Sequence, residues 1–419
     1  MKHLFTLMTI IAPLLFVGAV VAQDTTSFVV TQLTDRIYRL TTDEGEYTTN
    51  VLVFVGEDGL LLVDTNTEEK AAELKKVVES FDKGTPKYII NTHRHVEHVG
   101  GNAIFGPSPV IIAHYLVPQK LRSGSYIFNE FPEETFPDIT FTDSLTLFFN
   151  GERIRLVSVA GSHDDNEIMV HFTESKVVHL SSLINGMNFP SIDSDGNALR
   201  FEEVITRAIG LLPEDVTIVS GHNGLATWQD LHTYRDMIHE TAAIVRAGLD
   251  AGKDMATMQA EKVLAAYEAF NKSYVSPEGW IRYLATAIEK EKHPGQKKQK
   301  IFEPIYYALK EGGGEKGVQK YFELKNDSQQ NYEIREGDLM VIGDKLLGKG
   351  RVAEAIEMLK LSVQEFPQGQ YAYYGHFDLC NAYKQQGNKE KALEHCRKAM
   401  ELKPDFLAAA ELLKEIEKM

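Results

Sequence analysis

Cysteine is scarce in this chain of 419 residues, which contains only Cys380 and Cys396. Two cysteines near one end can form at most one intramolecular cross-link. A disulfide framework is therefore excluded as the basis of the fold. Both fall at packing positions of a predicted helical pair, where we expect free buried thiols, a disulfide being the alternative. The main core must therefore be held by buried apolar side chains.

Positive charge is also in short supply, because 44 lysines and arginines face 60 aspartates and glutamates, for a net charge of -16. Nucleic acids and anionic membrane surfaces are bound by clustered lysine and arginine, so we expect neither as a partner. The hydrophobic share of 43% and the charged share of 25% are typical of a globular protein. The length predicts two or three domains.

Long apolar runs are lacking, with one exception at the start of the sequence. Residues 4–22 are almost wholly apolar, and Val20 and Ala22 are small residues of the kind that precede a cleavage site. We therefore expect residues 1–22 to be a secretory signal peptide, and the mature protein to be periplasmic or secreted without membrane attachment. An uncleaved anchor is the alternative, which Pro13 and Gly18 disfavour.

The next part of the chain alternates short β-type runs with helical patterns. Two β-rich halves follow one another, each with helices at its margins, which predicts an α/β fold of the αββα sandwich type over residues 23–228. The predicted strands are 37–38, 51–55, 60–63, 87–91, 110–113, 145–149, 153–159, 168–172, 176–180 and 216–220, and the predicted helices are 68–81 and 201–212.

From residue 229 onward, strand patterns stop and helical patterns take over. We expect residues 229–300 to be a helical extension that ends in a linker at 293–300, where a Pro-Gly pair and a basic run occur. Residues 301–419 are predicted to form an all-α domain with an internal repeat of 37 residues. The repeated positions are Leu339, Gly343, Leu346, Gly350, Ala355, Leu359, Ser362 and Pro367, which recur as His376, Cys380, Tyr383, Gly387, Ala392, Cys396, Ala399 and Pro404.

This spacing resembles the tetratricopeptide repeat, a helix-turn-helix unit of about 34 residues. The resemblance implies a surface for a protein partner within residues 301–419. A degenerate earlier copy would span 304–324 and a closing helix 406–419. A helical bundle without repeats is the alternative interpretation.

Segment 91–102 carries chemistry that residue types alone can predict. It contains His93, His95, Glu97 and His98 directly after a predicted strand. In an extended stretch, residues two apart face the same way, so His93 and His95 can hold one metal ion. Glu97 and His98 can turn towards another, so the spacing predicts two metals.

The segment resembles the signature of the metallo-β-lactamase superfamily, His-x-His-x-Asp-His followed by glycines. The resemblance extends over residues 29–227 and adds His163 in Gly-Ser-His-Asp, His222 in Ser-Gly-His-Asn and Asp64 in Leu-Val-Asp-Thr. It implies Zn2+ as cofactor, two ions per chain, and a buried supporting role for Asp64. The implied ligands are His93, His95 and His163 for the first zinc, and Glu97, His98 and His222 for the second.

Two positions depart from the family pattern. Glu97 replaces the usual aspartate and reaches one methylene further, and Ser182 stands where many relatives have a bridging aspartate or a cysteine ligand. Family members that lack the cysteine also have serine there, so the second site need not be empty. Four further residues match no ligand position and are expected to be structural or solvated: His114, His171, His179 and Asp165.

The resemblance implies a zinc-dependent hydrolase acting on a small molecule. Metal-bound hydroxide would open a cyclic amide, a lactone or another ester or thioester, β-lactamase activity included. Glu97, which would orient the water, and His222 are the expected catalytic residues, and segments 126–136 and 187–190 are candidates to line the cleft. The alternatives are an adaptor protein with a degenerate zinc domain and an iron-dependent enzyme similar to persulfide dioxygenases.

Overall fold

The computed structural model of the chain describes residues 28–42, 48–193, 195–272, 275–292, 298–327, 329, 331–369 and 371–418. The predicted signal peptide, residues 1–22, lies outside this part. Among the described helices, none combines the length and the apolar character that a membrane crossing requires.

The first sheet contains seven strands in sequence order, β1 to β7. Strands β1 to β4 pair antiparallel, and from β4 to β7 the pairing is parallel. Parallel neighbours need a crossover, which helix α1 (Glu68–Glu79) supplies between β4 and β5. The strand bounds are Phe28–Gln32, Ile37–Thr42, Asn50–Gly56, Gly59–Val63, Tyr88–Ile90, Val110–His114 and Ile139–Phe141.

The second sheet contains six strands in the order β13-β12-β11-β10-β9-β8. Its strands pair antiparallel except β11 and β12, which are parallel and are connected through helix α4 (Phe201–Leu211). The strand bounds, from β8 to β13, are Ser144–Phe149, Glu152–Ser158, Ile168–Phe172, Val177–His179, Thr217–Val219 and Leu225–Ala226.

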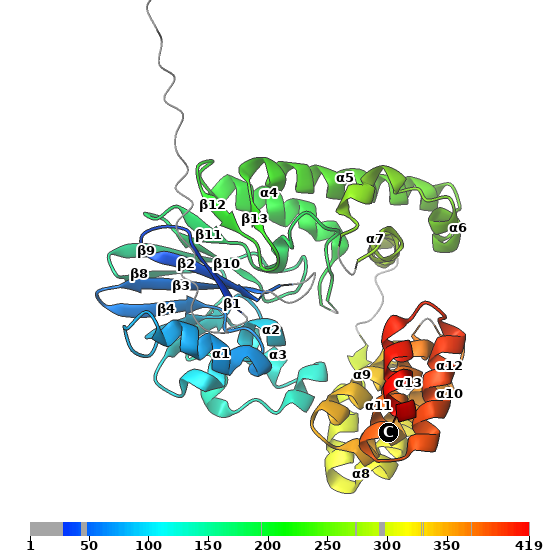
Figure 1. Ribbon diagram of the computed structural model, residues 1–419. Coiled ribbons are helices and arrows are strands. Elements are labelled where there is room, and N and C mark those ends of the chain that lie inside the picture. The colour runs from blue at the N-terminus through cyan, green and yellow to red at the C-terminus, as the bar shows by residue number, and fades with distance from the viewer. Residues whose placement is uncertain are drawn as a thin grey trace, which may run out of the picture.

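The sheets pack face to face, and strand β3 shows why. Successive side chains of a strand point to opposite faces, so Leu52 and Phe54 enter the core between the sheets, whereas Val51 and Val53 pack in the core shared with α1. Each such fully buried side chain contributes about 1.5–3 kcal/mol. Helices α4 and α5 cover the outer face of the second sheet, which confirms the predicted αββα sandwich (Figure 1).

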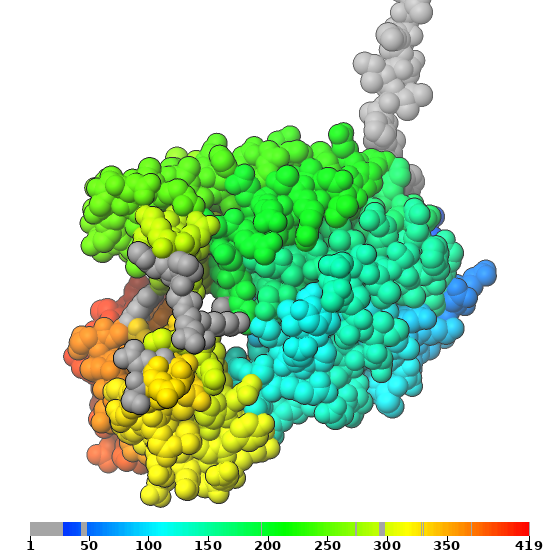
Figure 2. Space-filling view, turned by 180° about the vertical axis from the view of Figure 1, so that it is seen from behind, coloured from blue at the N-terminus to red at the C-terminus, as the bar shows by residue number. Residues whose placement is uncertain are grey.

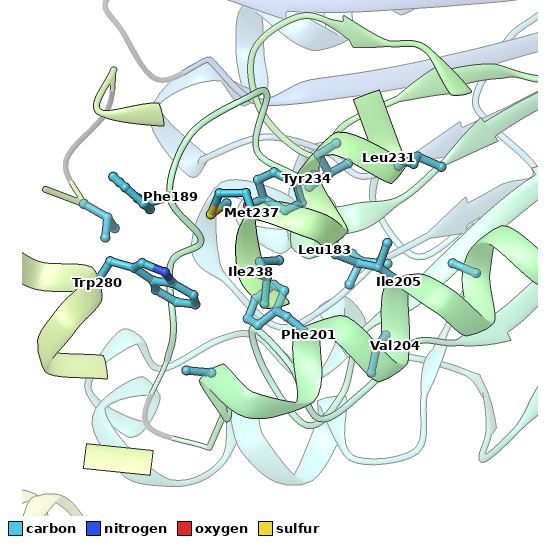
Figure 3. Packing of buried hydrophobic residues seen from close by; sticks show 14 of the residues in the cluster. Leu183, Phe189, Phe201, Val204, Ile205, Leu231, Tyr234, Met237, Ile238 and Trp280 are labelled. Atoms are coloured by element: carbon cyan, nitrogen blue, oxygen red, sulfur yellow. The ribbon is translucent and has the colours of Figure 1, made fainter. Parts of the chain in front are cut away.

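The helical extension shares a core with the second sheet. Trp280 of α7 (Pro277–Lys292) donates its indole N–H to Thr241 Oγ1 of α5 (Trp228–Asp250) at 2.9 Å. The same indole stacks on Phe189 of the sandwich at 6.3 Å, among the buried residues drawn in Figure 3. Helix α7 is thereby fixed to the sandwich.

The C-terminal helices have a core of their own. Gly343 of α9 packs against Leu359 of α10, and the positions 37 residues later hold Cys380 of α11 and Cys396 of α12. The same close approach therefore recurs in consecutive helix pairs. The helices are α8 (Phe302–Lys325), α9 (Glu336–Gly348), α10 (Val352–Glu365), α11 (Ala372–Gln385), α12 (Lys389–Leu402) and α13 (Leu407–Lys418).

Helix α8 is bent where the degenerate first copy of the repeat is predicted. Gly312 and Gly313 leave helical backbone values, and Gly313 has a φ of 66°, which favours glycine. Gly317 after the bend packs against Leu309 before it. The segment thus folds back on itself as a short helical pair.

Cys380 and Cys396 form a disulfide between α11 and α12, with Cα atoms 5.2 Å apart. The expectation of free thiols is wrong. The packing position that demands small side chains brings the two helices close enough for the sulfur atoms to bond. The bridge spans a sequence separation of 16, so it secures one helix pair and not the chain as a whole.

The other described elements are short and mostly lie in connections. They are α2 (Val96–Val99), α3 (Val117–Leu121), α6 (Met255–Ala260), the 3-10 helices η1 (Asn102–Phe105), η2 (Gly124–Asn129), η3 (Glu133–Thr135), η4 (Ser181–Leu183), η5 (Ala198–Arg200) and η6 (Ala265–Phe270), and the parallel pair β14 (Gln299–Lys300) and β15 (Tyr332–Glu333).

Candidate metal centre

The predicted ligands converge at one edge of the sandwich. The segment with His93 follows β5 of the first sheet, whereas His163 follows β9 and His222 follows β12 of the second. The neighbouring turn needs Gly101, because a Cβ there would overlap the carbonyl oxygen of Thr65. The local chain path therefore holds the histidine segment against the end of β4.

The structure brings all six predicted ligands together in two adjacent groups. Within each group the candidate ligand atoms lie within 4.8 Å of one another. His163 Nε2 is 3.3 Å from His95 Nδ1 in the first group, and His98 Nε2 is 3.3 Å from His222 Nε2 in the second. The groups are His93, His95 and His163, and Glu97, His98 and His222.

Asp64 supports the second group, as the resemblance implied. It follows β4 with a left-handed φ of 63°, an unusual backbone conformation that turns its carboxylate beneath the histidine segment. The carboxylate accepts hydrogen bonds from the Thr92 backbone N–H at 2.7 Å and from its hydroxyl at 2.8 Å. It also lies 2.6 Å from His98 Nδ1, which leaves His98 Nε2 to face the centre.

The first group has similar support. His163 Nδ1 lies 2.9 Å from the Ser191 carbonyl oxygen, and His95 Nε2 lies 2.8 Å from the Asp193 carboxylate. His93 Nε2 is buried and has no hydrogen-bond partner among the described residues. A buried nitrogen without a partner is costly unless it binds something. Imidazole and carboxylate are usual zinc ligands, so these residues fit a metal.

Burial and neighbouring charges set the protonation of this site. Burial lowers the pKa of His163 to about 3, which keeps that imidazole neutral. Burial alone would raise the pKa of Glu97, but the neighbouring histidines, His95 first among them, hold it well below its usual range. Glu97 is therefore an ionised carboxylate and His163 a neutral nitrogen donor.

Ser181, and not Ser182, contacts a predicted ligand. The Ser181 hydroxyl lies 3.2 Å from His93 Nδ1 and donates to Glu167 Oε1 at 3.0 Å, whereas Ser182 donates its backbone N–H to the same oxygen at 3.1 Å. Burial, and then Asp164, raises the pKa of Glu167 to about 8. Glu167 thus links Ser181, which contacts His93, to Ser182, the residue compared with the family's bridging position.

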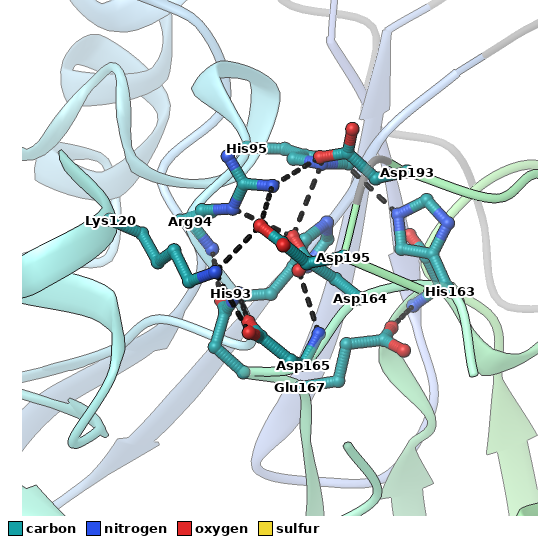
Figure 4. Close-up of polar contacts among 12 residues, drawn as sticks. His93, Arg94, His95, Lys120, His163, Asp164, Asp165, Glu167, Asp193 and Asp195 are labelled. Carbon is teal, nitrogen blue, oxygen red and sulfur yellow. Dashed lines mark hydrogen bonds and ion pairs between the residues drawn. The ribbon is translucent and has the colours of Figure 1, made fainter. Parts of the chain in front are cut away.

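A cluster of charged side chains beside the first group was not predicted from the sequence (Figure 4). Arg94 Nε donates to Asp164 at 2.8 Å and the other end of its guanidinium pairs with Asp193. Burial alone would lower the pKa of Arg94, but Asp193 and Asp164 raise it, so the guanidinium stays charged. Lys120 lies 2.6 Å from Asp195 and 2.8 Å from Asp165, which is half-buried in an ion pair and not the solvated turn residue we expected.

Segment η2 connects this centre with the C-terminal helices. The ring of Tyr126 stacks on His95 at 6.3 Å and lies 4.7 Å from the Arg94 guanidinium. The next two residues, Ile127 and Phe128, are buried in the core of the C-terminal domain. Of the two candidate cleft segments, 126–136 thus reaches the centre, whereas Phe189 of 187–190 packs on Trp280 in the core.

Comparisons with known proteins agree with this architecture. Residues 45–247 match the sequence model of the metallo-beta-lactamase superfamily, and residues 373–406 match that of the tetratricopeptide repeat. Residues 45–247 therefore belong to the metallo-β-lactamase superfamily, and a tetratricopeptide-repeat region follows them.

Several solved structures are similar to this chain at low sequence identity. A metallo-β-lactamase from Pontibacter korlensis is 18% identical over 51% of this chain and 99% of its own, with a TM-score of 0.45. The DIM-1 metallo-β-lactamase is 14% identical over 52% of this chain and 99% of its own, with a TM-score of 0.44. A double mutant of the sec-alkyl sulfatase PisA1 is 12% identical over 89% of this chain and 65% of its own, with a TM-score of 0.52. The TM-score of the sulfatase indicates a likeness of fold alone and leaves the activity open.

Proposed function

We propose that this protein is a zinc-dependent hydrolase that cleaves an ester, a thioester, a lactone or a cyclic amide in a small molecule. One observation carries the proposal, the two adjacent groups of three ligands in a fold whose superfamily includes many hydrolases. Zinc supplies a hydroxide at neutral pH and polarises a carbonyl group. His93, His95 and His163 would hold one ion, and the second group would hold another.

The protein's own residues would orient the ligands and the water. Asp64 and the Ser191 carbonyl fix which nitrogen of His98 and of His163 faces the centre. The ionised Glu97 carboxylate can accept a hydrogen bond from an attacking water and so direct its lone pair. His222 completes the second group opposite Glu97.

Differences in exposure define the side from which a substrate approaches. His93, His98 and His222 are completely buried, whereas the side chains of His95 and Glu97 keep 13% and 25% exposure. A substrate would therefore reach the centre over His95 and Glu97. Tyr126, stacked on His95, would border its path.

The tetratricopeptide repeat is consistent with a protein partner in addition to the substrate. We also propose export, on the basis of the apolar residues 4–22, and the disulfide suits an oxidising compartment.

The first experiment measures metal content by mass spectrometry on the purified protein, together with hydrolysis of a chromogenic cephalosporin and a lactone panel before and after chelation. We expect close to two zinc ions and turnover that chelation abolishes. His163→Ala and His222→Ala should each lose about one ion, and His239→Ala, on the exposed face of α5, should lose none.

Other outcomes would favour the alternative hypotheses. Zinc bound without turnover of any substrate would support the adaptor interpretation. Iron in place of zinc, with oxidation of a persulfide, would support the dioxygenase-like enzyme.

A further inference from the structure

A cavity of about 1360 Å³ lies where the sandwich, helix α7 and the C-terminal domain meet. Figure 2 shows the hollow between the helical extension above and the C-terminal domain below. Arg94 and Asp193 belong to its wall, and Asp193 is bonded to the predicted ligand His95. The cavity therefore begins one residue away from the candidate metal centre.

Positive charge gathers on the cavity walls that lie outside the sandwich. Arg282, Thr286 and Lys290 of α7 follow at intervals of four residues, so one face of that helix turns to the cavity. Lys298, Lys300 and Arg335 line it from the beginning of the C-terminal domain. The chain as a whole has 60 acidic and 44 basic residues, so the excess of basic side chains on these walls is opposite in sign to the net charge.

The acidic residues of the wall are fewer, and most are engaged. Asp193 and Asp195 neutralise Arg94 and Lys120, and Asp338 pairs with Arg335 at 3.1 Å. Among the described residues of the lining, Glu303 is the remaining carboxylate. On the sandwich side of the cavity the positive and negative charges thus balance. The basic character of the cavity comes from the opposite walls.

Lys290 and Lys298 are the cations that remain available. Neither makes an ion pair with a residue that the structure describes. Lys300 pairs with Glu333 at 2.5 Å. Burial would raise the pKa of Glu333, but Lys300, and then Arg335 and Lys290, lower it.

Segment η2 fixes the C-terminal domain beside the cavity. Phe128 packs edge-on against Tyr306 of α8 at 5.2 Å. Glu130 accepts a hydrogen bond from the Tyr306 hydroxyl at 2.6 Å and pairs with Lys310 at 2.9 Å. Tyr307 and Tyr371, 57% and 37% exposed, add aromatic surface along the cavity. The cavity can therefore recognise an organic ion at a fixed distance from the centre.

We propose that this cavity binds small organic anions, and that the substrate carries a carboxylate, phosphate or sulfate group remote from the bond that is cleaved. Lys290 and Lys298 hold this group with support from Lys300 and Arg335, while the reacting bond lies beside His95 and Glu97. The statement about cleavage rests on the proposed function. Binding of the anion does not.

The binding test uses the full chain and suberate, a dicarboxylate, in titration calorimetry at low salt. We expect the Lys290→Ala and Lys298→Ala double variant to weaken suberate binding at least tenfold. Lys83→Ala combined with Lys414→Ala removes the same charge from exposed sites elsewhere and should leave binding within twofold. Phosphate and sulfate, titrated separately, identify which anion the site prefers.

The activity test uses 4-nitrophenyl half-esters of dicarboxylic acids of increasing length, each paired with an uncharged ester of the same length. The native protein should prefer the acid at one length, and the double lysine variant should lose that preference through KM. If the protein binds suberate but hydrolyses none of the esters, the anion site is retained and the proposed hydrolase is refuted. Turnover with no preference, or binding unchanged in the double variant, would refute the anion site, because a carboxylate bound only at the metals would not sense either lysine.

Discussion

At the scale of single residues, Asp193 determines how His95 is presented. Its carboxylate lies 2.8 Å from His95 Nε2 and also pairs with Arg94, so His95 offers Nδ1 to the candidate centre. Partners of this kind fix the tautomer and the ring plane of a histidine ligand. Asp193 is therefore as much a part of the proposed site as the ligands themselves.

We expect Asp193→Ala to lower the affinity of the first site for zinc by about 10–100-fold, because His95 loses its acceptor. Competition with a chromogenic chelator measures this affinity. Asp195→Ala is the matched control, since Asp195 lies in the same loop and pairs with Lys120. Equal affinities for the two variants would contradict the assignment.

What could be predicted at this scale depended on distance along the sequence. His93, His95, Glu97 and His98 are neighbours, so their spacing alone indicated a metal site. Asp193 lies 98 residues from His95 and reaches it only through the fold, and no local pattern marks its loop. His163 and His222 were found only because short family sequences surround them.

At the scale of elements, η2 is shared between two cores. Tyr126 faces the candidate centre and its neighbours Ile127 and Phe128 are buried in the C-terminal domain. This arrangement gives the repeats a structural role at the centre, because they hold the segment that carries Tyr126.

Phe128→Ala should remove about 3–5 kcal/mol of packing between the domains. We expect faster proteolysis near residue 124, a fall in kcat/KM of about tenfold and an unchanged zinc content. Phe148→Ala, whose side chain is 75% exposed, serves as the control. Unaltered proteolysis would show that η2 does not depend on the repeats.

The elements that the sequence predicted are those with a clear period. The runs 51–55 of β3 and 60–63 of β4 are continuously apolar because both faces are covered, and α1 and α4 have one buried stripe each. Short elements such as β7, η2 and α3 are placed by tertiary contacts and have too few residues to show a pattern.

At the scale of the whole molecule, the protein has separate cores joined at η2. The sandwich and extension have their own buried clusters, and the C-terminal helices share another with Ile127 and Phe128. The repeat spacing predicted this second unit. The disulfide was only the alternative to free thiols, because spacing shows which positions pack together and not whether two sulfur atoms bond.

Two treatments should therefore act on different unfolding transitions in calorimetry. Chelation should lower the transition of the sandwich, because it removes ions that bind only the folded state. Reduction of the Cys380–Cys396 disulfide should lower the free energy of unfolding of the C-terminal domain by about 2–4 kcal/mol, and with it the temperature of that domain's transition. The Cys380→Ser and Cys396→Ser double variant should not respond to reductant, and one transition that shifts in both treatments would contradict this separation.

The shared segment η2 also constrains the evolution of the sequence. A substitution at Phe128 alters a pocket built by Tyr306, although the two residues lie in different domains. The repeats can therefore not be exchanged for another helical module without compensating changes beside His95. We therefore expect the two domains to occur together in related proteins, and the residues on the two sides of this contact to change together.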